Sequence, residues 1–331
     1  MSKIAVDLMG SDLGYSELSK AVIQFINEDK NSSFILYGEE DKIQPLFADV
    51  DSKRFKIVNT TEVIPMEIKP LDFLRANRSS MYQAIKAVKE GEADAVVSAG
   101  STGGFVVGST ILLRNIDGVT RAGLCTPFPT AIKNRPCVIL DVGASNVNTG
   151  EDIYGFARMG RIYAEDITEI HNPSVYTLSN GSEEGKGPQE VVDAYELMKT
   201  RKLTGFKGNC EAREALDGNH DVIVTSGYVG NIFLKATEGT AGMMNGMIKK
   251  AFKRNIFSKI GYLFAKKGIK DMKETLDYRR FGGAILLGIN GVAVKAHGNS
   301  NTYAFYNAIK VADSMVKHDI INKIKKEFSN D

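Results

Sequence analysis

Val97-Ser98-Ala99-Gly100-Ser101-Thr102-Gly103-Gly104 is the stretch that decides the fold of this chain. The apolar residues 95–97 that lead into it predict a β-strand, and residues 105–113 that follow it predict a helix. A glycine turn between a strand and a helix exposes backbone N–H groups at the positive end of the helix dipole, where an anion can bind. The same turn also forms without a ligand, so this stretch alone leaves both interpretations open.

Strands and helices alternate along the chain on both sides of this turn. Because such alternation is typical of a mostly parallel sheet with helices on both faces, we predict an α/β fold. Ligands bind outside the carboxyl ends of parallel strands, where several polar glycine loops are found here, and we expect those loops to converge on one site. The predicted strands cover residues 4–8, 34–38, 53–58, 95–97, 122–127, 136–140, 174–178 and 222–224, and the predicted helices cover residues 17–27, 80–89, 105–113, 153–166, 189–200 and 231–253.

The C-terminal third adds two further features. Residues 281–291 and the apolar residues after them predict an antiparallel pair of strands that turns at Asn290-Gly291, and a glycine turn at 295–300 leads into the last helix. Residues 255–270 predict an amphipathic helix with Ile256, Phe257, Ile260, Leu263 and Phe264 on one stripe and lysines elsewhere. Such a helix either packs in a core or a dimer, or lies on an anionic membrane surface.

Composition limits the class of protein. The 331 residues are 43% hydrophobic and 25% charged, which is typical of a globular protein, and the net charge of +2 gives no reason to expect nucleic acid as a partner. Three cysteines and four histidines have no metal-ligand spacing, so we predict no metal and a reducing, cytoplasmic compartment. The first residues predict a strand and not a signal peptide, and no apolar run is long enough to span a membrane.

No standard catalytic or nucleotide-binding motif is present. Residues 181–186 have one spacer residue too few for a P-loop, and Gly187 stands where Ser or Thr is required. The serine nucleophile elbow and the full dinucleotide pattern are also missing. The small polar loops therefore suit the binding of anions better than nucleophilic catalysis by the protein. Their available donors are Lys186, Lys235, Lys295, His297 and Asn231, and Lys186 could equally be a solvated loop residue.

Motifs along nearly the whole chain resemble those of the PlsX family, the acyl-acyl-carrier-protein:phosphate acyltransferases of bacterial phospholipid synthesis. Each motif is weak alone, but their order is specific. Where the family usually has Asn, Asn and Asp, this chain has Ser101, Ser145 and Ser226. The matching motifs are Asp7-Leu8-Met9-Gly10-Ser11-Asp12, Ser79-Ser80-Met81, residues 97–104, residues 141–146, Glu183-Glu184-Gly185-Lys186-Gly187, Gly227-Tyr228-Val229-Gly230-Asn231 with Leu234-Lys235 and Glu238-Gly239, Phe281-Gly282-Gly283 with Leu286-Leu287-Gly288, and Lys295-Ala296-His297-Gly298.

The resemblance implies a fold and an activity. It implies a single domain over residues 1–331, a three-layer α/β/α Rossmann-like sandwich resembling the isocitrate/isopropylmalate dehydrogenase-like fold, with a helical hairpin protruding at about residues 240–275. The implied enzyme transfers a long-chain fatty acyl group from acyl-carrier protein to inorganic phosphate, without a cofactor. The implied partners are a second copy in a homodimer, a peripheral membrane surface and the downstream membrane acyltransferase.

The same resemblance assigns roles to residues. Lys186 and Asn231 are the implied active-site residues, with the N–H groups of the glycine turn and Lys186 holding phosphate and Asn231 donating to the thioester oxygen. Substrate-binding roles are predicted for Gly100, Ser101, Thr102, Gly103, Lys235 and His297, and membrane association for Phe257, Ile260, Leu263 and Phe264. Two alternatives stay open: a phosphate acetyltransferase-like enzyme that uses acyl-coenzyme A, and an inactive membrane-associated scaffold, which only the three serine departures favour.

Overall fold

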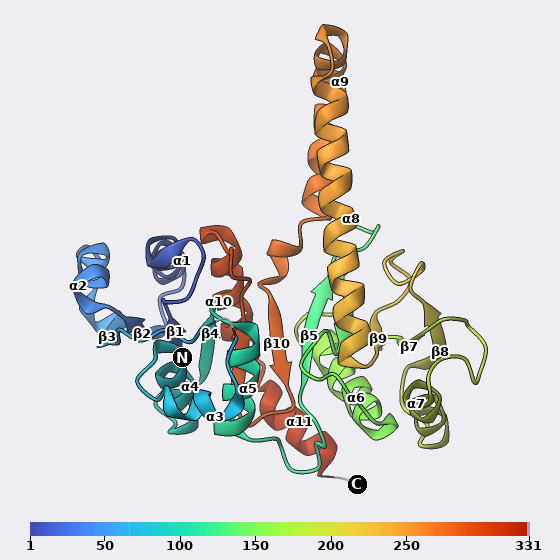
Figure 1. The fold of residues 1–331 in the computed structure, drawn as a ribbon, viewed down its shortest axis with the longest axis horizontal. Helices are drawn as coiled ribbons and strands as arrows, with labels where there is room; N and C mark the ends of the chain where they lie inside the picture. The colour runs from blue at the N-terminus through green and yellow to red at the C-terminus, as the bar shows by residue number, and fades with distance from the viewer. Residues whose placement is uncertain (66, 330–331) are drawn as a thin grey trace.

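A central sheet organises the molecule. The computed structural model describes residues 1–65 and 67–329, and the predicted domain over 1–331 includes residues 66, 330 and 331, which lie outside that description. Within the described residues, eleven strands form one sheet (Figure 1). In sheet order the strands are β3 (Phe55–Asn59), β2 (Ser33–Gly38), β1 (Lys3–Asp7), β4 (Ala95–Ser98), β11 (Val292–Lys295), β10 (Ala284–Leu287), β5 (Gly123–Phe128), β6 (Cys137–Leu140), β9 (Val222–Val224), β7 (Val175–Ser179) and β8 (Phe206–Glu211).

Helices cover both faces of this sheet, which confirms the predicted three-layer α/β/α architecture. In β1, Ile4 and Val6 are buried against one layer of helices, while Ala5 between them is buried against the other. The first layer contains α1, α6, α7, α10 and α11, and the second contains α3, α4, α5 and the start of α8. The helices are α1 (Gly14–Glu28), α2 (Glu40–Ile43), α3 (Pro70–Arg75), α4 (Ser80–Lys89), α5 (Thr102–Leu113), α6 (Gly150–Asp166), α7 (Gln189–Thr200), α8 (Gly227–Lys253), α9 (Ile256–Thr275), α10 (Thr302–Lys317) and α11 (Ile320–Phe328).

The strand directions change in the middle of the sheet. β3, β2, β1, β4 and β11 are mutually parallel, and so are β6, β9, β7 and β8. Between these two groups, the contacts of β11 with β10, of β10 with β5 and of β5 with β6 are all antiparallel. Three reversals leave the two parallel groups running in opposite directions. The glycine loops therefore do not all leave one edge of the sheet, and the expectation that they all converge there is only partly right.

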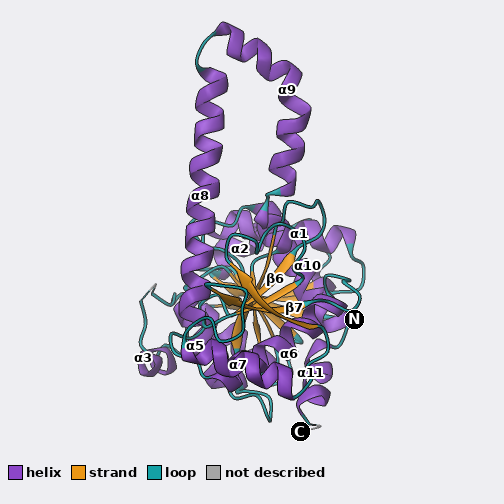
Figure 2. Ribbon diagram, turned by 90° about the vertical axis from the view of Figure 1, so that its right-hand side faces the viewer, coloured by secondary structure: helices purple, strands orange, loops and turns teal. Residues whose placement is uncertain are grey.

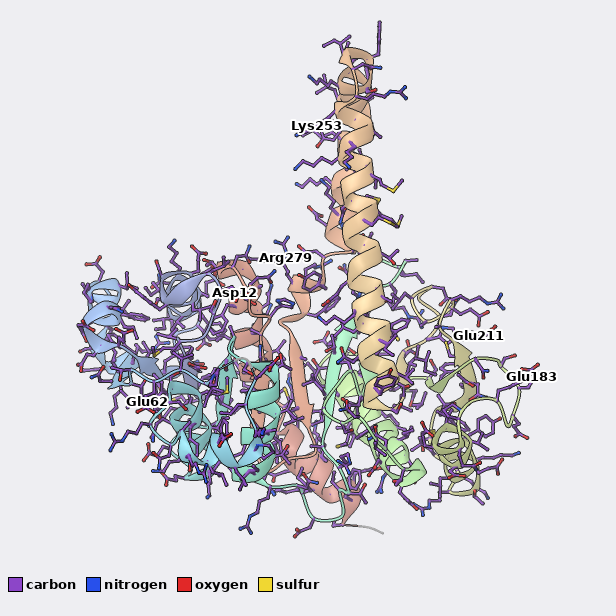
Figure 3. All side chains as sticks on the ribbon, in the orientation of Figure 1. Asp12, Glu62, Glu183, Glu211, Lys253 and Arg279 are labelled. Carbon is purple, nitrogen blue, oxygen red and sulfur yellow. The ribbon has the colours of Figure 1, made fainter. Side chains whose placement is uncertain are left out.

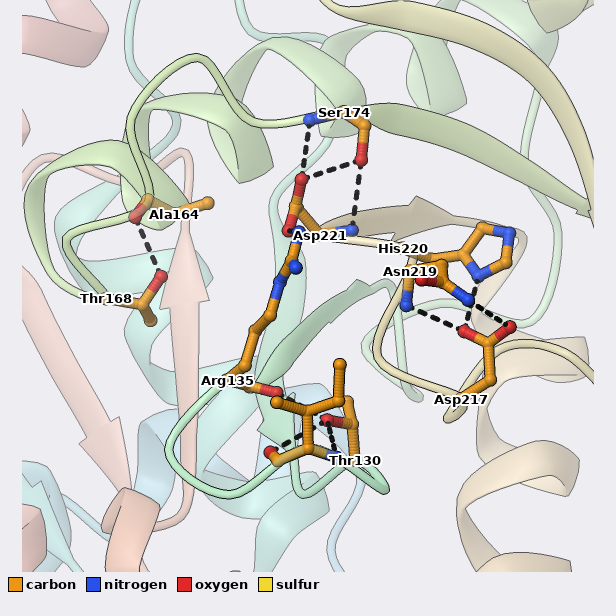
Figure 4. A network of polar contacts seen from close by, with 10 residues as sticks. Thr130, Arg135, Ala164, Thr168, Ser174, Asp217, Asn219, His220 and Asp221 are labelled. Carbon is orange, nitrogen blue, oxygen red and sulfur yellow. Dashed lines mark hydrogen bonds and ion pairs between the residues drawn. The ribbon is translucent and has the colours of Figure 1, made fainter.

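Asp221 ties together the strand starts in the second parallel group (Figure 4). Its carboxylate accepts from the N–H of Ser174 at 3.0 Å and the hydroxyl of Ser174 at 2.7 Å, just before β7. It also accepts from Arg135 at 3.2 Å, just before β6. Asp221 itself precedes β9, and its carbonyl accepts from Val138 of β6. One side chain thus fixes the relative positions of β6, β7 and β9, which carry three of the polar loops.

α8 and α9 form the predicted protruding hairpin. Both helices extend far out of the globular body and are joined at their distal end (Figure 2). Contact between them near that end includes the rings of Phe252 and Tyr262, whose centroids are 5.4 Å apart. None of the residues of α9, all of which the structure describes, is buried. The hairpin therefore leaves most of its side chains exposed in the isolated chain.

Two local predictions need correction. The chain after the 295–300 turn forms two helices, α10 and α11, instead of a single last helix, because Asp319 adopts a left-handed conformation at φ 55° that interrupts the first one. The edge strand β8 was not predicted, because its sequence, Phe206-Lys207-Gly208-Asn209-Cys210-Glu211, contains residues that are depleted in strands.

Candidate active site

One cavity of about 420 Å³ lies where the glycine turn, the β11–α10 loop and the base of the hairpin meet. In Figure 3, Asp12 and Arg279, which both line it, lie on the side of α8 that faces β1 and β10. Its lining comes from chain segments that are far apart in the sequence. The lining residues are Asp12, Gly100, Thr102, Leu124, Thr126–Pro129, Val142, Gly143, Asn231, Leu234, Lys235, Thr237, Glu238, Ala241, Leu276, Tyr278, Arg279, Gly282–Ala284, Lys295–Ser300 and Ala304.

The glycine turn is braced by two serines. Ser98 donates its hydroxyl to the buried Asp7 carboxylate at 2.7 Å and accepts from the N–H of Gly100 at 3.0 Å. Ser101 caps α5 by accepting from the N–H of Gly104 at 3.1 Å. In the described part of the chain, the N–H of Thr102 has no protein acceptor, as expected for the first residue of a helix. The turn is therefore rigid and directs one end of α5 towards the cavity.

Lys295 is the least exposed cation of the cavity. Its side chain is only 5% exposed, and it is the register partner of Ser98 on the neighbouring strand, so it lies beside the glycine turn. Burial lowers the pKa of Lys295 to about 8, although the nearby Asp7 and Asp12 carboxylates oppose that shift. Burial also raises the pKa of Asp7, and the positive charge of Lys295 opposes that rise. An anion that binds beside Lys295 stabilises the charged form of this buried lysine, so the site favours anion binding.

Other charges at the cavity already have partners. Lys235 pairs with Glu238 at 2.8 Å, and Arg279 pairs with Asp277 at 2.8 Å. The Nζ of Lys295 instead donates to the carbonyl of Ala296. Among the described residues that line the cavity, Lys295 is thus the one lysine or arginine that forms no ion pair. This difference makes Lys295 the strongest candidate for binding an anion.

Asn231 is placed by close packing between α8 and the loop after β6. The Asp141 carboxylate organises that loop, and burial raises its pKa even though five donors point at it. Two glycines of α8 let the helix approach: a Cβ on Gly227 would lie 2.1 Å from the carbonyl oxygen of Ser145, and one on Gly230 would lie 1.8 Å from that of Asp141. Asn231 then lies against Gly143 and lines the cavity. The donors to Asp141 are the N–H groups of Leu124, Gly143, Ala144 and Ser145 and the hydroxyl of Ser145.

The structure brings together most of the predicted site residues. Gly100, Thr102, Asn231, Lys235 and His297 all line the cavity. The exposed His297 accepts from the N–H of Asn299 at its Nδ1 (3.3 Å), which leaves Nε2 as the protonated nitrogen of the neutral ring. Ser101 and Gly103 lie in the same turn but are not among the lining residues, because the buried hydroxyl of Ser101 caps the helix.

Lys186 does not lie at this cavity. It is exposed on the loop after β7, where its N–H donates to the carbonyl of Glu183 at 3.3 Å. Figure 3 shows Glu183 at the outer side of the molecule, well separated from Asp12 at the cavity. The physical reason is the sheet order, since β6 and β9 separate β7 from β5. The active-site role of Lys186 stays a prediction.

Lys295 and Asp7 are the functional candidates that sequence reasoning did not single out. Lys295 was one of several available donors, and Asp7 was named only as the first residue of a family motif. The sequence does contain a pattern that could have identified them, because each is a charged residue at the end of an apolar strand. Asp7 follows Ile4-Ala5-Val6, and Lys295 follows Val292-Ala293-Val294. In residues 1–65 and 67–329, no cluster of three or more His, Cys, Asp or Glu side chains is placed to hold a metal ion.

The apolar stripe of α9 is exposed along the hairpin. Phe257 and Phe264 are 79% and 87% exposed, and Leu263 and Ile260 are 69% and 47% exposed. The interpretation of this helix as part of the core of the chain is therefore wrong, while packing in a dimer and contact with a membrane both stay possible. No helix in the described ranges combines the length and apolarity needed to cross a bilayer.

Comparison with known proteins identifies relatives over the full length. A family model described as fatty acid synthesis protein matches residues 2–323. A protein of Mesoplasma florum named phosphate acyltransferase is 37% identical over 331 residues, covering 99% of this chain and 100% of the relative. A protein of the same name from Exiguobacterium sibiricum is 40% identical over 324 residues, covering 97% of each.

Solved structures share the fold at low sequence identity. A phosphotransacetylase of Streptococcus pyogenes has a TM-score of 0.65 at 17% identity, covering 96% of this chain and 94% of that one. A 4-hydroxythreonine-4-phosphate dehydrogenase of Klebsiella pneumoniae has a TM-score of 0.52 at 12% identity, covering 95% and 98%. These similarities confirm the dehydrogenase-like α/β fold class expected from the motifs.

Proposed function

Because the chain belongs to the fatty acid synthesis protein family, whose relatives are named phosphate acyltransferases, we propose that it transfers a long-chain fatty acyl group from acyl-carrier protein to inorganic phosphate. The product is an acyl phosphate for glycerophospholipid synthesis. The chain is thus an acyltransferase enzyme. The observation that carries the proposal is a cavity in which Lys295, buried and in no ion pair with any described residue, lies beside the N-terminus of α5.

The proposed reaction needs positioning more than proton transfer. Phosphate binds to the Nζ of Lys295 and the N–H of Thr102, and one of its oxygens attacks the thioester carbonyl carbon. Asn231 donates its amide N–H to the developing oxyanion and stabilises its charge. The C–S bond then breaks, and the thiolate leaves and takes up a proton. An ordinary thiol has a pKa of about 8.5, so it departs without a strong acid.

Direct measurement of acyl phosphate tests the function. The purified chain is incubated with phosphate and either hexadecanoyl-acyl-carrier protein or hexadecanoyl-coenzyme A. We expect acyl phosphate with the carrier-protein donor at a clearly higher kcat/KM. A preference for coenzyme A would favour the phosphate acetyltransferase-like alternative, and no product from either donor would favour the inactive scaffold.

Replacing Asn231 with alanine is expected to lower kcat at least about tenfold, because one oxyanion donor is lost. The measurement is acyl phosphate formation at saturating substrates, with thermal melting as a check on the fold. Asn322→Ala on α11, outside the cavity lining, is the matched control and should keep the wild-type rate. A wild-type kcat in Asn231→Ala would exclude the proposed oxyanion contact. The same assay examines Lys186→Ala, for which the family assignment also predicts at least about a tenfold loss.

The exposed stripe of α9 supports peripheral membrane association. Replacing Phe257 and Leu263 together with aspartate is expected to abolish sedimentation with anionic liposomes, because both side chains are largely exposed and apolar. Gly242→Asp with Gly246→Asp is the matched control, since it adds the same charge to the hairpin on α8, off the α9 stripe, at positions where a Cβ meets nothing within 4 Å. Unchanged sedimentation of the first variant would count against the membrane surface. The predicted homodimer and downstream membrane acyltransferase stay predictions.

A further inference from the structure

The cavity extends from the strand ends to the base of the α8–α9 hairpin. At the strand ends it is lined by Thr102 and Lys295, and at the hairpin base by Ala241 of α8 and Leu276 just after α9. Along α8 the lining runs from Asn231 to Ala241, which corresponds to about 15 Å of helix. The cavity is therefore elongated, and its two ends are formed by different parts of the fold.

Apolar side chains form the walls of the part nearest the hairpin. Leu276 and Tyr278 are 45% and 47% exposed and line the cavity, although large apolar side chains usually seek burial. Leu234 of α8 is half-buried on the same lining, and Phe128 and Pro129 at the end of β5 also line the cavity. Exposed apolar side chains that surround a hollow are typical of a ligand site.

Among the described residues of this apolar part, both cations already have a carboxylate partner. Lys235 is neutralised by Glu238, and Arg279 is neutralised by Asp277. Both pairs lie at the rim, because Lys235 and Arg279 keep 61% and 45% of their side chains exposed. Among the described lining residues, the cation without an ion pair, Lys295, is at the other end of the cavity. A ligand that fits both ends is anionic or polar at one end and a long apolar chain at the other.

We propose that the fatty acyl chain of the substrate lies between α8 and the segment containing Leu276 and Tyr278, and extends from Asn231 towards Ala241. The inference rests on the proposed function, because the reacting thioester must lie at the polar end. The hairpin base then forms the wall of the acyl site, and its length sets the chain length that contributes to binding. A short acyl group does not reach Ala241, whereas a long one does.

Ala241→Trp tests this placement, because an indole at an exposed helix position fills the far end of the site without disturbing a core. We expect kcat/KM to fall at least about tenfold with hexadecanoyl-acyl-carrier protein and to change less than about twofold with butanoyl-acyl-carrier protein. Met243→Trp is the matched control, since Met243 is 60% exposed on α8 but does not line the cavity. The control variant should have the wild-type kcat/KM with both acyl donors.

Equal losses with both donors, or no loss with either, would overturn the acyl site. A second measurement separates that result from a failure of the proposed function. Unlabelled hexadecanoyl phosphonate, which carries the acyl chain and an anionic head but cannot turn over, is titrated against wild type and both variants by isothermal titration calorimetry. Binding that weakens at least about tenfold in Ala241→Trp and not in Met243→Trp supports the acyl site, and equal binding by all three proteins contradicts it. Absence of acyl phosphate in wild type would instead refute the proposed function.

Discussion

Replacing Lys295 with methionine is expected to lower kcat/KM for phosphate at least about 100-fold, a loss of about 2.7 kcal/mol. Methionine has a similar length and keeps the apolar contacts of the stem, but it cannot hold an anion. The expected loss is large because Lys295 is only 5% exposed and because it makes no ion pair with the described residues around it. The measurement is acyl phosphate formation as a function of phosphate concentration, together with thermal melting.

Lys89→Met is the matched control for this substitution. Lys89 is an exposed lysine of α4 that does not line the cavity, so the same change of side chain should leave kcat/KM unaltered. An unchanged kcat/KM for phosphate in Lys295→Met would refute the proposed phosphate contact. If Lys295→Met has the wild-type melting temperature but a lower kcat/KM, the loss arises from binding or catalysis and not from misfolding.

The pH dependence gives a second readout of the same variant. Since the pKa of Lys295 is about 8, its side chain is mostly charged below that pH and mostly neutral above it. The ratio of wild-type to Lys295→Met kcat/KM for phosphate should therefore be largest below about pH 8 and fall as the pH rises through that value. Taking the ratio cancels the ionisation of phosphate itself. Asp7 and Asp12, which face Lys295, and the neighbouring His297 are present in both proteins.

Replacing Gly230 with alanine is expected to lower the free energy of unfolding by about 3 kcal/mol. A Cβ at this position would lie 1.8 Å from the carbonyl oxygen of Asp141 and 3.1 Å from the side chain of Thr225. Backbone must move to relieve the first contact, because the oxygen belongs to the main chain. Alanine gains only about 1 kcal/mol over glycine in a helix, so overpacking dominates. The shift also displaces Asn231, the next residue, and should lower turnover.

Gly239→Ala on the same helix provides the matched control. A Cβ there meets nothing within 4 Å, so only the helix preference acts, and the variant should be more stable by up to about 1 kcal/mol. Urea unfolding of both variants and of the wild type gives the three free energies of unfolding. If Gly230→Ala is as stable as Gly239→Ala, α8 does not dock on Asp141 as the structure has it.

Local sequence patterns predicted much of the fold and part of the site. The helix predicted over residues 80–89 forms as Ser80–Lys89, and β10 and β11 form the expected antiparallel pair. The polar loops offered Asn231 and His297 as donors, the family resemblance gave them their site roles, and both line the cavity. Lys295 could not be ranked above the other donors, because its lowered pKa comes from burial by strands far away in the sequence.

The sequence by itself determined the elements, the family and the chemistry of the turn at residues 97–104, because strand and helix periods, caps and glycine turns are local properties. Only the tertiary structure decided which loops meet. In the sheet order β6 and β9 lie between β5 and β7, so Lys186 after β7 is held away from the cavity, while Asn231, which follows β9, reaches it. Strand direction and order depend on hydrogen bonds between distant segments, and no single segment encodes them.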